Sequence, residues 1–163
     1  MKNHQKIHDR CAVLEQMILQ IAPLYHTMNE DQQRLVTTTI GAALFYVPHG
    51  EATCYSGFVS AEAYGYLRSG KKTTLTKEHR IPRRLSALEL INKAINNEPL
   101  NLMEAYLERY SKFNYVLPKE NKRLIPFQKE NRFSSPEEAY DSAGIELVPL
   151  SLAQLKAFRR MAA

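Results

Sequence analysis

Residues 73–84, TTLTKEHRIPRR, form the stretch around which the rest of the chain is organised. The threonines at its start are β-favouring, and Pro82 cannot continue a helix because it has no backbone N–H to donate. The stretch therefore predicts a short strand that ends near Glu78 and His79. The segment Arg68–Arg84 contains seven Lys or Arg residues and a single acid, Glu78. A carboxylate beside an imidazole in so cationic a setting suggests chemistry on a phosphate.

A second strand is expected at residues 113–117, FNYVL, because this segment is aromatic and β-branched. Pro118 then opens a helical turn that runs to Leu124. Between the two strands, residues 86–97 start with the spacing of a capping box, and the helical pattern restarts over residues 99–110. The order expected along the chain is strand, helical hairpin, strand and helix.

The segments on either side are expected to be mainly helical. Apolar residues recur every three or four positions over residues 5–25, which indicates an amphipathic helix. A second helix is expected from the cap at Asn29 to an end near Pro48-His49-Gly50. Residues 51–58 show no clear period and are expected to form a loop or a short extended piece.

Three further helices follow from capping signals. Ser60 is expected to cap a short helix that ends at Leu67. Ser135 is followed by proline at the first helical position, and the helix that starts there is expected to close at Gly144. Residues 145–148 are expected to be extended, and a terminal helix is expected after Ser151.

The composition is that of a protein that folds. Hydrophobic residues make up 44% and charged residues 24% of the 163-residue chain, so extensive disorder is not expected. The formal net charge of +5 favours polyanionic partners. Cys11 and Cys54 are too few for a disulfide framework and are interpreted as reduced thiols. No secretion signal or membrane-spanning run is recognised, which predicts a cytoplasmic protein without a membrane partner.

Residues 73–124 resemble the split signature of the HNH, or ββα-metal, endonucleases. In that family an acid-His pair followed by Ile-Pro ends the first strand, as Glu78-His79-Arg80-Ile81-Pro82 does here. A His or Asn of the helix after the second strand completes the signature, and Asn121 occupies that place. The resemblance covers about a third of the chain and implies a divergent member, with Glu in place of the more usual Asp and an enlarged segment between the strands.

The resemblance implies a role for each residue of the signature. His79 would be the general base that activates water, while Glu78 and Asn121 would bind a divalent metal, Mg²⁺ or Mn²⁺. These roles agree with the chemistry, because imidazole titrates near neutral pH and hard cations prefer oxygen ligands. The phosphates of the substrate would be held by five cationic residues: Arg80, Arg83, Arg84, Lys122 and Arg123. The expected substrate is DNA, and RNA is an open alternative.

These observations predict an α+β fold, mostly helical, in which two short antiparallel strands and a helix form a small ββα-metal motif. One domain is expected over residues 1–163, because the length suits a single core. It would consist of a helical part at 1–70, the motif with its inserted hairpin at 71–126 and C-terminal helices at 127–163. The N-terminal helices also offer a surface for a homo-oligomer.

Two alternatives to the nuclease remain open. The first is a non-catalytic protein that binds nucleic acid, or serves in an assembly, through the basic surface around residues 68–84. The second is a small helical interaction protein that uses the N-terminal half alone.

Overall fold

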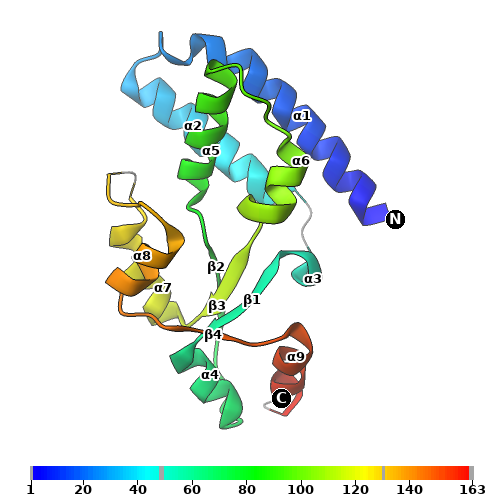
Figure 1. Cartoon of the computed structure of the whole chain (residues 1–163), viewed down its shortest axis with the longest axis vertical. Helices are drawn as coiled ribbons and strands as arrows, with labels where there is room; N and C mark the ends of the chain where they lie inside the picture. Colours follow the sequence, from blue (N-terminus) through cyan, green and yellow to red (C-terminus); the bar gives the residue numbers. More distant parts are fainter. Residues whose placement is uncertain (1, 48–49, 130, 162–163) are drawn as a thin grey trace. The chain divides into compact units, whose positions relative to one another are not determined.

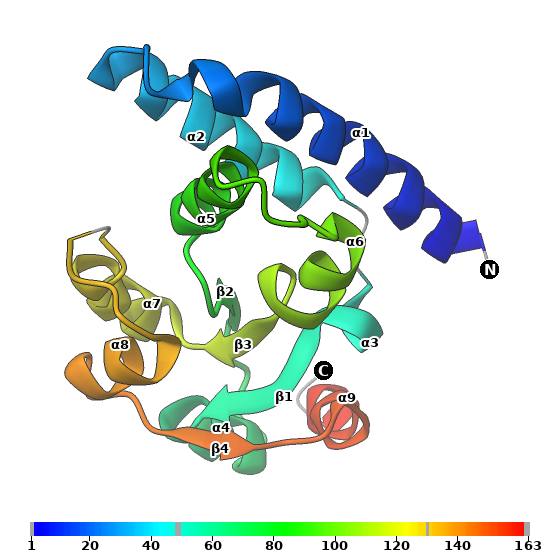
Figure 2. The same cartoon turned by 45° about the horizontal axis from the view of Figure 1, so that its top comes forward.

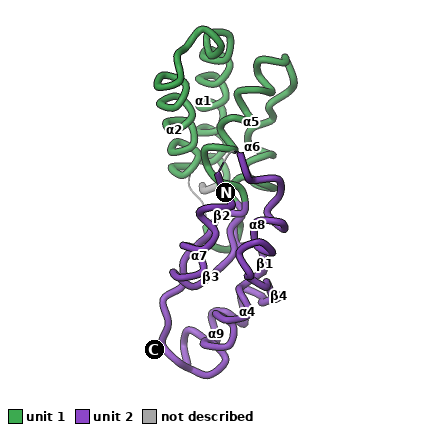
Figure 3. The backbone as a smooth tube through the Cα atoms, turned by 90° about the vertical axis from the view of Figure 1, so that its left-hand side faces the viewer, with its two compact units in different colours: residues 1–53, 81–111 green, residues 54–80, 112–163 purple. Residues whose placement is uncertain are grey.

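The computed structural model describes residues 2–47, 50–129 and 131–161 of the chain (Figure 1). It confirms a mostly helical α+β fold with one small sheet. The chain forms two compact units, coloured separately in Figure 3. Unit 1 consists of residues 1–53 and 81–111, and unit 2 consists of residues 54–80 and 112–163. The single-domain organisation stays a prediction.

Unit 1 is a helical cluster. Its main helices are α1 (Lys2–Tyr25), α2 (Glu30–Tyr46) and α5 (Arg83–Ile95), and α5 packs against both α1 and α2 (Figure 2). They are followed by α6 (Leu102–Ala105) and the π-helical turn η1 (Tyr106–Tyr110). The predicted amphipathic helix at the N-terminus is confirmed, because its apolar stripe forms one wall of the core of this unit.

Two close contacts fix the interior of unit 1. Gly41 of α2 lies so near α5 that a Cβ atom at this position would be 2.9 Å from the carbonyl oxygen of Arg83. The Tyr106 hydroxyl donates a hydrogen bond of 3.0 Å to the carbonyl of Val47. The small residue permits close helix packing, and the hydrogen bond satisfies a buried phenol.

Unit 2 contains a four-stranded sheet. Its strands are β1 (Tyr55–Ser60), β2 (Thr76–His79), β3 (Phe113–Val116) and β4 (Leu147–Pro149), in the spatial order β2-β3-β1-β4. β3 pairs antiparallel with β2 and parallel with β1, while β4 pairs antiparallel with β1. The two strands predicted from sequence around Glu78 and at residues 113–117 are therefore confirmed, and they are neighbours.

Each face of the sheet is covered by its own helices. Phe113 and Tyr115 of β3 pack in one apolar cluster with residues of α4 (Ala61–Arg68) and α9 (Leu152–Met161). Val116 packs in another cluster with α7 (Pro118–Leu124), η2 (Ile125–Phe127) and α8 (Pro136–Ser142). Successive side chains of a strand point to opposite faces, so β3 contributes to both cores.

The structure corrects two local predictions. Residues 51–58 were expected to form a loop or a short extended piece: the extended alternative is confirmed for residues 55–58, which belong to the central strand β1, but residues 51–54 form a helical turn, α3 (Glu51–Cys54). The part at 1–70 is therefore not wholly helical. Gly57 has φ +89° and the register with β3 shifts between Tyr55 and Val59, which interrupts the alternation that would reveal a strand. The helix expected from Ser86 begins three residues earlier, because Pro82 takes the capping position.

The end predicted for the second helix falls partly on Pro48 and His49, which lie outside the described residues. In the described parts of the chain, no helix combines the length and the apolar character that a membrane span requires. Cys11 and Cys54 are both buried free thiols, as predicted, and burial raises the pKa of the Cys11 thiol to about 11.

Candidate functional site

The candidate site is built on the pairing of β2 with β3. Glu78 lies directly opposite Asn114 in this antiparallel pair, and His79 lies opposite Phe113. Residues opposite each other share a face of the sheet. Glu78 and Asn114 therefore lie on the face covered by α7 and α8, and His79 lies on the face covered by α4 and α9.

The Glu78 side chain is buried in a chain of hydrogen bonds, with only 3% of its surface exposed. One carboxylate oxygen accepts from the Tyr140 hydroxyl and the other from the Gln128 amide. The Asn114 amide donates to the Tyr140 oxygen at 2.8 Å, and Ser56 donates to the Asn114 carbonyl. Four side chains from separate segments of unit 2 thus connect, directly or in sequence, to one carboxylate.

The electrostatics of Glu78 follow from this burial. Desolvation raises the pKa of the carboxyl to about 7, although the hydrogen bonds from Tyr140 and Gln128 and the charge of Arg80 act in the opposite direction. Burial and the neighbouring Glu78 raise the pKa of Tyr140, which keeps its proton at neutral pH. The site therefore contains a carboxyl that titrates near neutrality beside a neutral phenol.

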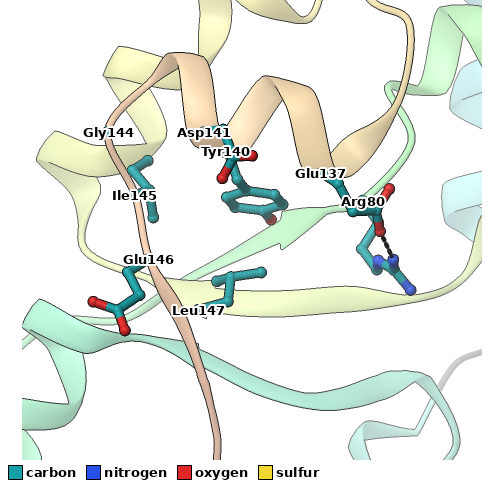
Figure 4. A pocket seen from close by; sticks show the side chains of 8 residues that line it. All are labelled: Arg80, Glu137, Tyr140, Asp141, Gly144, Ile145, Glu146 and Leu147. Atoms are coloured by element: carbon teal, nitrogen blue, oxygen red, sulfur yellow. Dashed lines mark hydrogen bonds and ion pairs between the residues drawn. The ribbon is translucent and has the colours of Figure 1, made fainter.

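A cavity of about 530 Å³ is lined in part by Tyr140 (Figure 4). The Tyr140 ring points from α8 toward the sheet, and its hydroxyl donates a hydrogen bond to Glu78. An ion pair of 2.5 Å between Arg80 and Glu137 lies at one end, and Glu146 lies at the other. The cavity could admit a small ligand, but its cationic residue is already paired with an acid.

His79 has different neighbours from Glu78. Its ring contacts that of Phe113 edge to face, with the centroids 6.4 Å apart. The Lys77 ammonium lies 5.0 Å from the centroid of the same Phe113 ring. Lys77 and His79 alternate with Glu78 along β2, which explains why they share the opposite face.

Asn121 lies on α7, which packs on the same side of the sheet as Glu78, but the side chains that donate hydrogen bonds to the carboxylate are Tyr140 and Gln128. The segment reaches Glu78 through Gln128 instead, seven residues later and about two helical turns further along. The neighbour Glu120 is buried and has a structural role: it accepts hydrogen bonds from the Ser60 hydroxyl at 2.5 Å and from the Leu117 amide at 2.8 Å.

The five residues expected to hold phosphates do not form one cluster in either unit. Arg83 and Arg84 belong to unit 1, where the Arg83 guanidinium lies 3.9 Å from the Phe45 ring centroid. Arg80, Lys122 and Arg123 belong to unit 2. Arg80 forms an ion pair with Glu137, and the Arg123 guanidinium nitrogen Nη2 lies 3.9 Å from the carboxylate oxygen Oε1 of Glu120.

The residues around Glu78 do not fit a divalent ion in this arrangement. A single carboxylate is present, and each of its oxygens already accepts a hydrogen bond. Within residues 2–47, 50–129 and 131–161, no group of three or more His, Cys, Asp or Glu side chains is placed to hold a metal. Mg²⁺ and Mn²⁺ need several oxygen ligands, and binding here would have to displace Tyr140 and Gln128.

Sequence reasoning missed most of the residues that surround Glu78: Ser56, Asn114, Gln128 and Tyr140. One sequence signal could have identified Asn114: it is the polar residue of an otherwise apolar strand. The structure shows that it is fully buried. A buried amide needs hydrogen-bond partners, so a polar cluster could be expected beside it. The other three residues carry no such local signal.

Comparisons with known proteins give no match: no protein-family model fits the chain, and no curated protein or solved structure resembles it.

Proposed function

We propose that unit 2 is a phosphodiesterase that hydrolyses nucleic acid, with DNA as the first substrate to test and His79 as its general base. The proposal is supported by one arrangement: β2 and β3 pair antiparallel, α7 follows β3 directly, and α7 packs against β2. Glu78 and His79 stand at the end of β2. This is the order of elements that the HNH resemblance implies.

The roles of the protein's own residues follow from their surroundings. The His79 imidazole takes a proton from the attacking water as the general base. Glu78 anchors β2 to α8 and to the segment after η2, which holds the end of the strand in place. Because the donors around Glu78 do not fit a metal, no step is assigned to Mg²⁺ or Mn²⁺, and the expected dependence on a metal is treated as a measurement.

Cleavage assays test the proposal. Plasmid DNA, single-stranded DNA and RNA are incubated with the full chain in Mg²⁺, in Mn²⁺ or in EDTA. His79→Ala should lower the cleavage rate about 100-fold or more and leave nucleic-acid binding intact. His26→Ala, which changes a histidine of unit 1, is the matched control. Intact substrates in every wild-type reaction, or equal cleavage by His79→Ala, would overturn the proposal.

A non-catalytic nucleic-acid-binding protein is the second candidate. It is favoured by the hydrogen bonding of Glu78: each carboxylate oxygen already accepts a hydrogen bond, which gives the residue a structural role and requires no catalytic role. In this case His79→Ala has no effect on any activity of the chain, while Arg83→Glu with Arg84→Glu abolishes binding. Equal binding by that double variant would count against it.

We also propose that unit 1 mediates self-association through α1 and α2. Val13, Met17 and Tyr46 are 63%, 50% and 73% exposed, and they line an apolar cavity of about 440 Å³. Apolar side chains grouped in this way are typical of interaction surfaces. Light scattering after size exclusion should give a dimer for the wild type and a monomer for Val13→Glu with Met17→Glu; a wild-type monomer at all concentrations would refute the idea.

A further inference from the structure

A cavity of about 650 Å³ lies in unit 1, between α1 and the segment that contains α6 and η1. α1 packs against α6 (Figure 2). Residues three or four positions apart share one face of a helix, so α1 lines the cavity with a single face that includes His8, Cys11 and Glu15. The Glu15 carboxylate accepts a hydrogen bond of 2.9 Å from the Leu102 amide, which holds this face of α1 against the start of α6.

Three carboxylates line this cavity without a cation. Glu15 belongs to α1, Glu104 to α6 and Glu108 to η1, and none of the described residues of the lining is Lys or Arg. Neither Glu104 nor Glu108 forms an ion pair within the described parts of the chain, whereas Glu89 and Glu137 each pair with an arginine. Like charges that share a cavity repel each other, so a cation bound there would lower the free energy of this arrangement.

The rest of the lining is largely apolar. Leu102 is fully buried, and Met103 and Leu107 are partly buried beside it. The Cys11 thiol also lines the cavity; it is 2% exposed and has no hydrogen-bond partner among the described residues. Burial and the nearby Glu15 raise the pKa of this thiol to about 11, so it stays neutral and can accept weakly from an N–H group. A ligand that fits this lining has apolar segments as well as positive charge.

We propose that this cavity binds a linear aliphatic polyamine. Its ammonium groups donate hydrogen bonds to the carboxylates of Glu15, Glu104 and Glu108, and its methylene segments lie against Met103 and Leu107. The cavity volume falls within the range of about 300–1,000 Å³ that is usual for small-molecule sites. The site is independent of the proposed function of unit 2, because all of its residues belong to unit 1.

Isothermal titration calorimetry of the full chain with spermidine tests the site. Hexaamminecobalt(III) is the matched ligand, because it is also a trivalent cation but has no methylene groups. The wild type should bind spermidine about tenfold or more tightly than hexaamminecobalt(III), since apolar contacts add to the attraction between charges. No binding of spermidine, or equal affinity for the two cations, would overturn the proposal.

Glu104→Gln with Glu108→Gln tests the role of the carboxylates. The variant should bind spermidine about tenfold or more weakly, because two charged hydrogen-bond acceptors are lost. Asp141→Asn with Glu146→Gln is the matched control: it removes the same charge from two exposed acids of unit 2 and should bind spermidine as the wild type does. An equal loss of affinity in both variants would show that binding follows net charge alone, which would refute the site.

Ala12→Phe tests the cavity without a change of charge. Ala12 is an exposed residue of α1 that lines the cavity, so the larger side chain would fill part of the space that the ligand needs. The variant should lose spermidine binding and keep the helix content of the wild type in circular dichroism. Gln20→Phe, at an exposed position of α1 outside the lining, should bind as the wild type does. Unchanged spermidine binding by folded Ala12→Phe would place the ligand elsewhere and overturn the proposal.

Discussion

Glu78 and His79 are consecutive residues of β2, yet their side chains lie on opposite faces of the sheet. The Glu78 carboxylate meets Tyr140 of α8, and the His79 ring meets Phe113 on the α4 and α9 side. The acid-His pair recognised in the sequence is therefore a pair along the backbone whose members have separate surroundings. In unit 2 the acid connects the end of β2 to α8 and to the segment after η2, and the histidine packs against Phe113.

The titration of Glu78 predicts a pH-dependent stability. The folded-state pKa of about 7 is above the ordinary value of 4.5, so between these pH values the folded state holds a proton that the unfolded state has lost. The contribution of Glu78 to the free energy of unfolding should thus be fully present below pH 4.5. About 3 kcal/mol of it should be lost as the pH rises from 4.5 through 7.

Glu78→Gln checks this prediction, because the amide cannot ionise. Urea unfolding at pH 4.5, 6 and 8 should show a flatter profile for the variant, which should be more stable than the wild type at pH 8. The exposed Glu108→Gln serves as the control and should follow the wild-type profile. Parallel profiles for the wild type and Glu78→Gln would contradict the assignment.

Tyr140→Phe should destabilise the chain by about 2 kcal/mol at pH 8. The change removes a donor to Glu78 and leaves the Asn114 amide without its acceptor. The effect should shrink in the background of Glu78→Gln, because the two residues interact directly. Chemical denaturation measures the effect of Tyr140→Phe in both backgrounds. The control is Tyr66→Phe, at a partly exposed tyrosine of α4, which should change stability little. Strictly additive effects of Tyr140→Phe and Glu78→Gln would show that the two side chains are not coupled.

Two glycines of unit 2 should respond to alanine in opposite directions. Gly57 has φ +89° with open space around it, so Gly57→Ala strains the backbone alone and should cost about 1–2 kcal/mol. Gly65 lies within α4, also in open space but without a positive φ, so Gly65→Ala should stabilise by about 0.5–1 kcal/mol. Thermal unfolding compares them, and a shift of the same sign in both would refute the prediction.

Gly41→Ala tests the packing of unit 1. The new methyl group would lie 2.9 Å from the Arg83 carbonyl oxygen, so α2 and α5 must move apart. Overpacking of this kind should cost about 1–3 kcal/mol, measured by urea unfolding. Gly50→Ala is the control and should leave stability nearly unchanged, because a Cβ atom at this position would have no heavy atom of the described residues, its chain neighbours aside, within 4 Å. A neutral Gly41→Ala would mean that the helices are not in close contact.

The parts of the fold that could be predicted are those with a local signal. The apolar period of α1 and the Pro82 break after β2 are properties of neighbouring residues, and they identified these elements. β1 was expected only as one of two alternatives, a loop or a short extended piece, because Gly57 interrupts its alternation. A bulge of this kind removes the one pattern by which a short strand can be recognised.

The candidate site was less predictable, because its contacts are made at long range. Tyr140 is 62 residues from Glu78 in the sequence, and nothing near either residue indicates that they meet. The basic segment was interpreted as one surface, yet Arg80 and Arg83 fall in different units, since the boundary lies between Arg80 and Ile81. Charge counted along the sequence could not locate that boundary.

The strand order has a consequence for how the chain is made. All residues of unit 1 precede Lys112, so that unit is complete in sequence while β1 and β2 still lack β3, the strand that pairs with both. During synthesis the edges of these two strands stay unpaired until the ribosome has released the segments that form β3 and β4. Unpaired strand edges are sites of aggregation, so unit 2 should depend on prompt completion of the chain, whereas unit 1 should not.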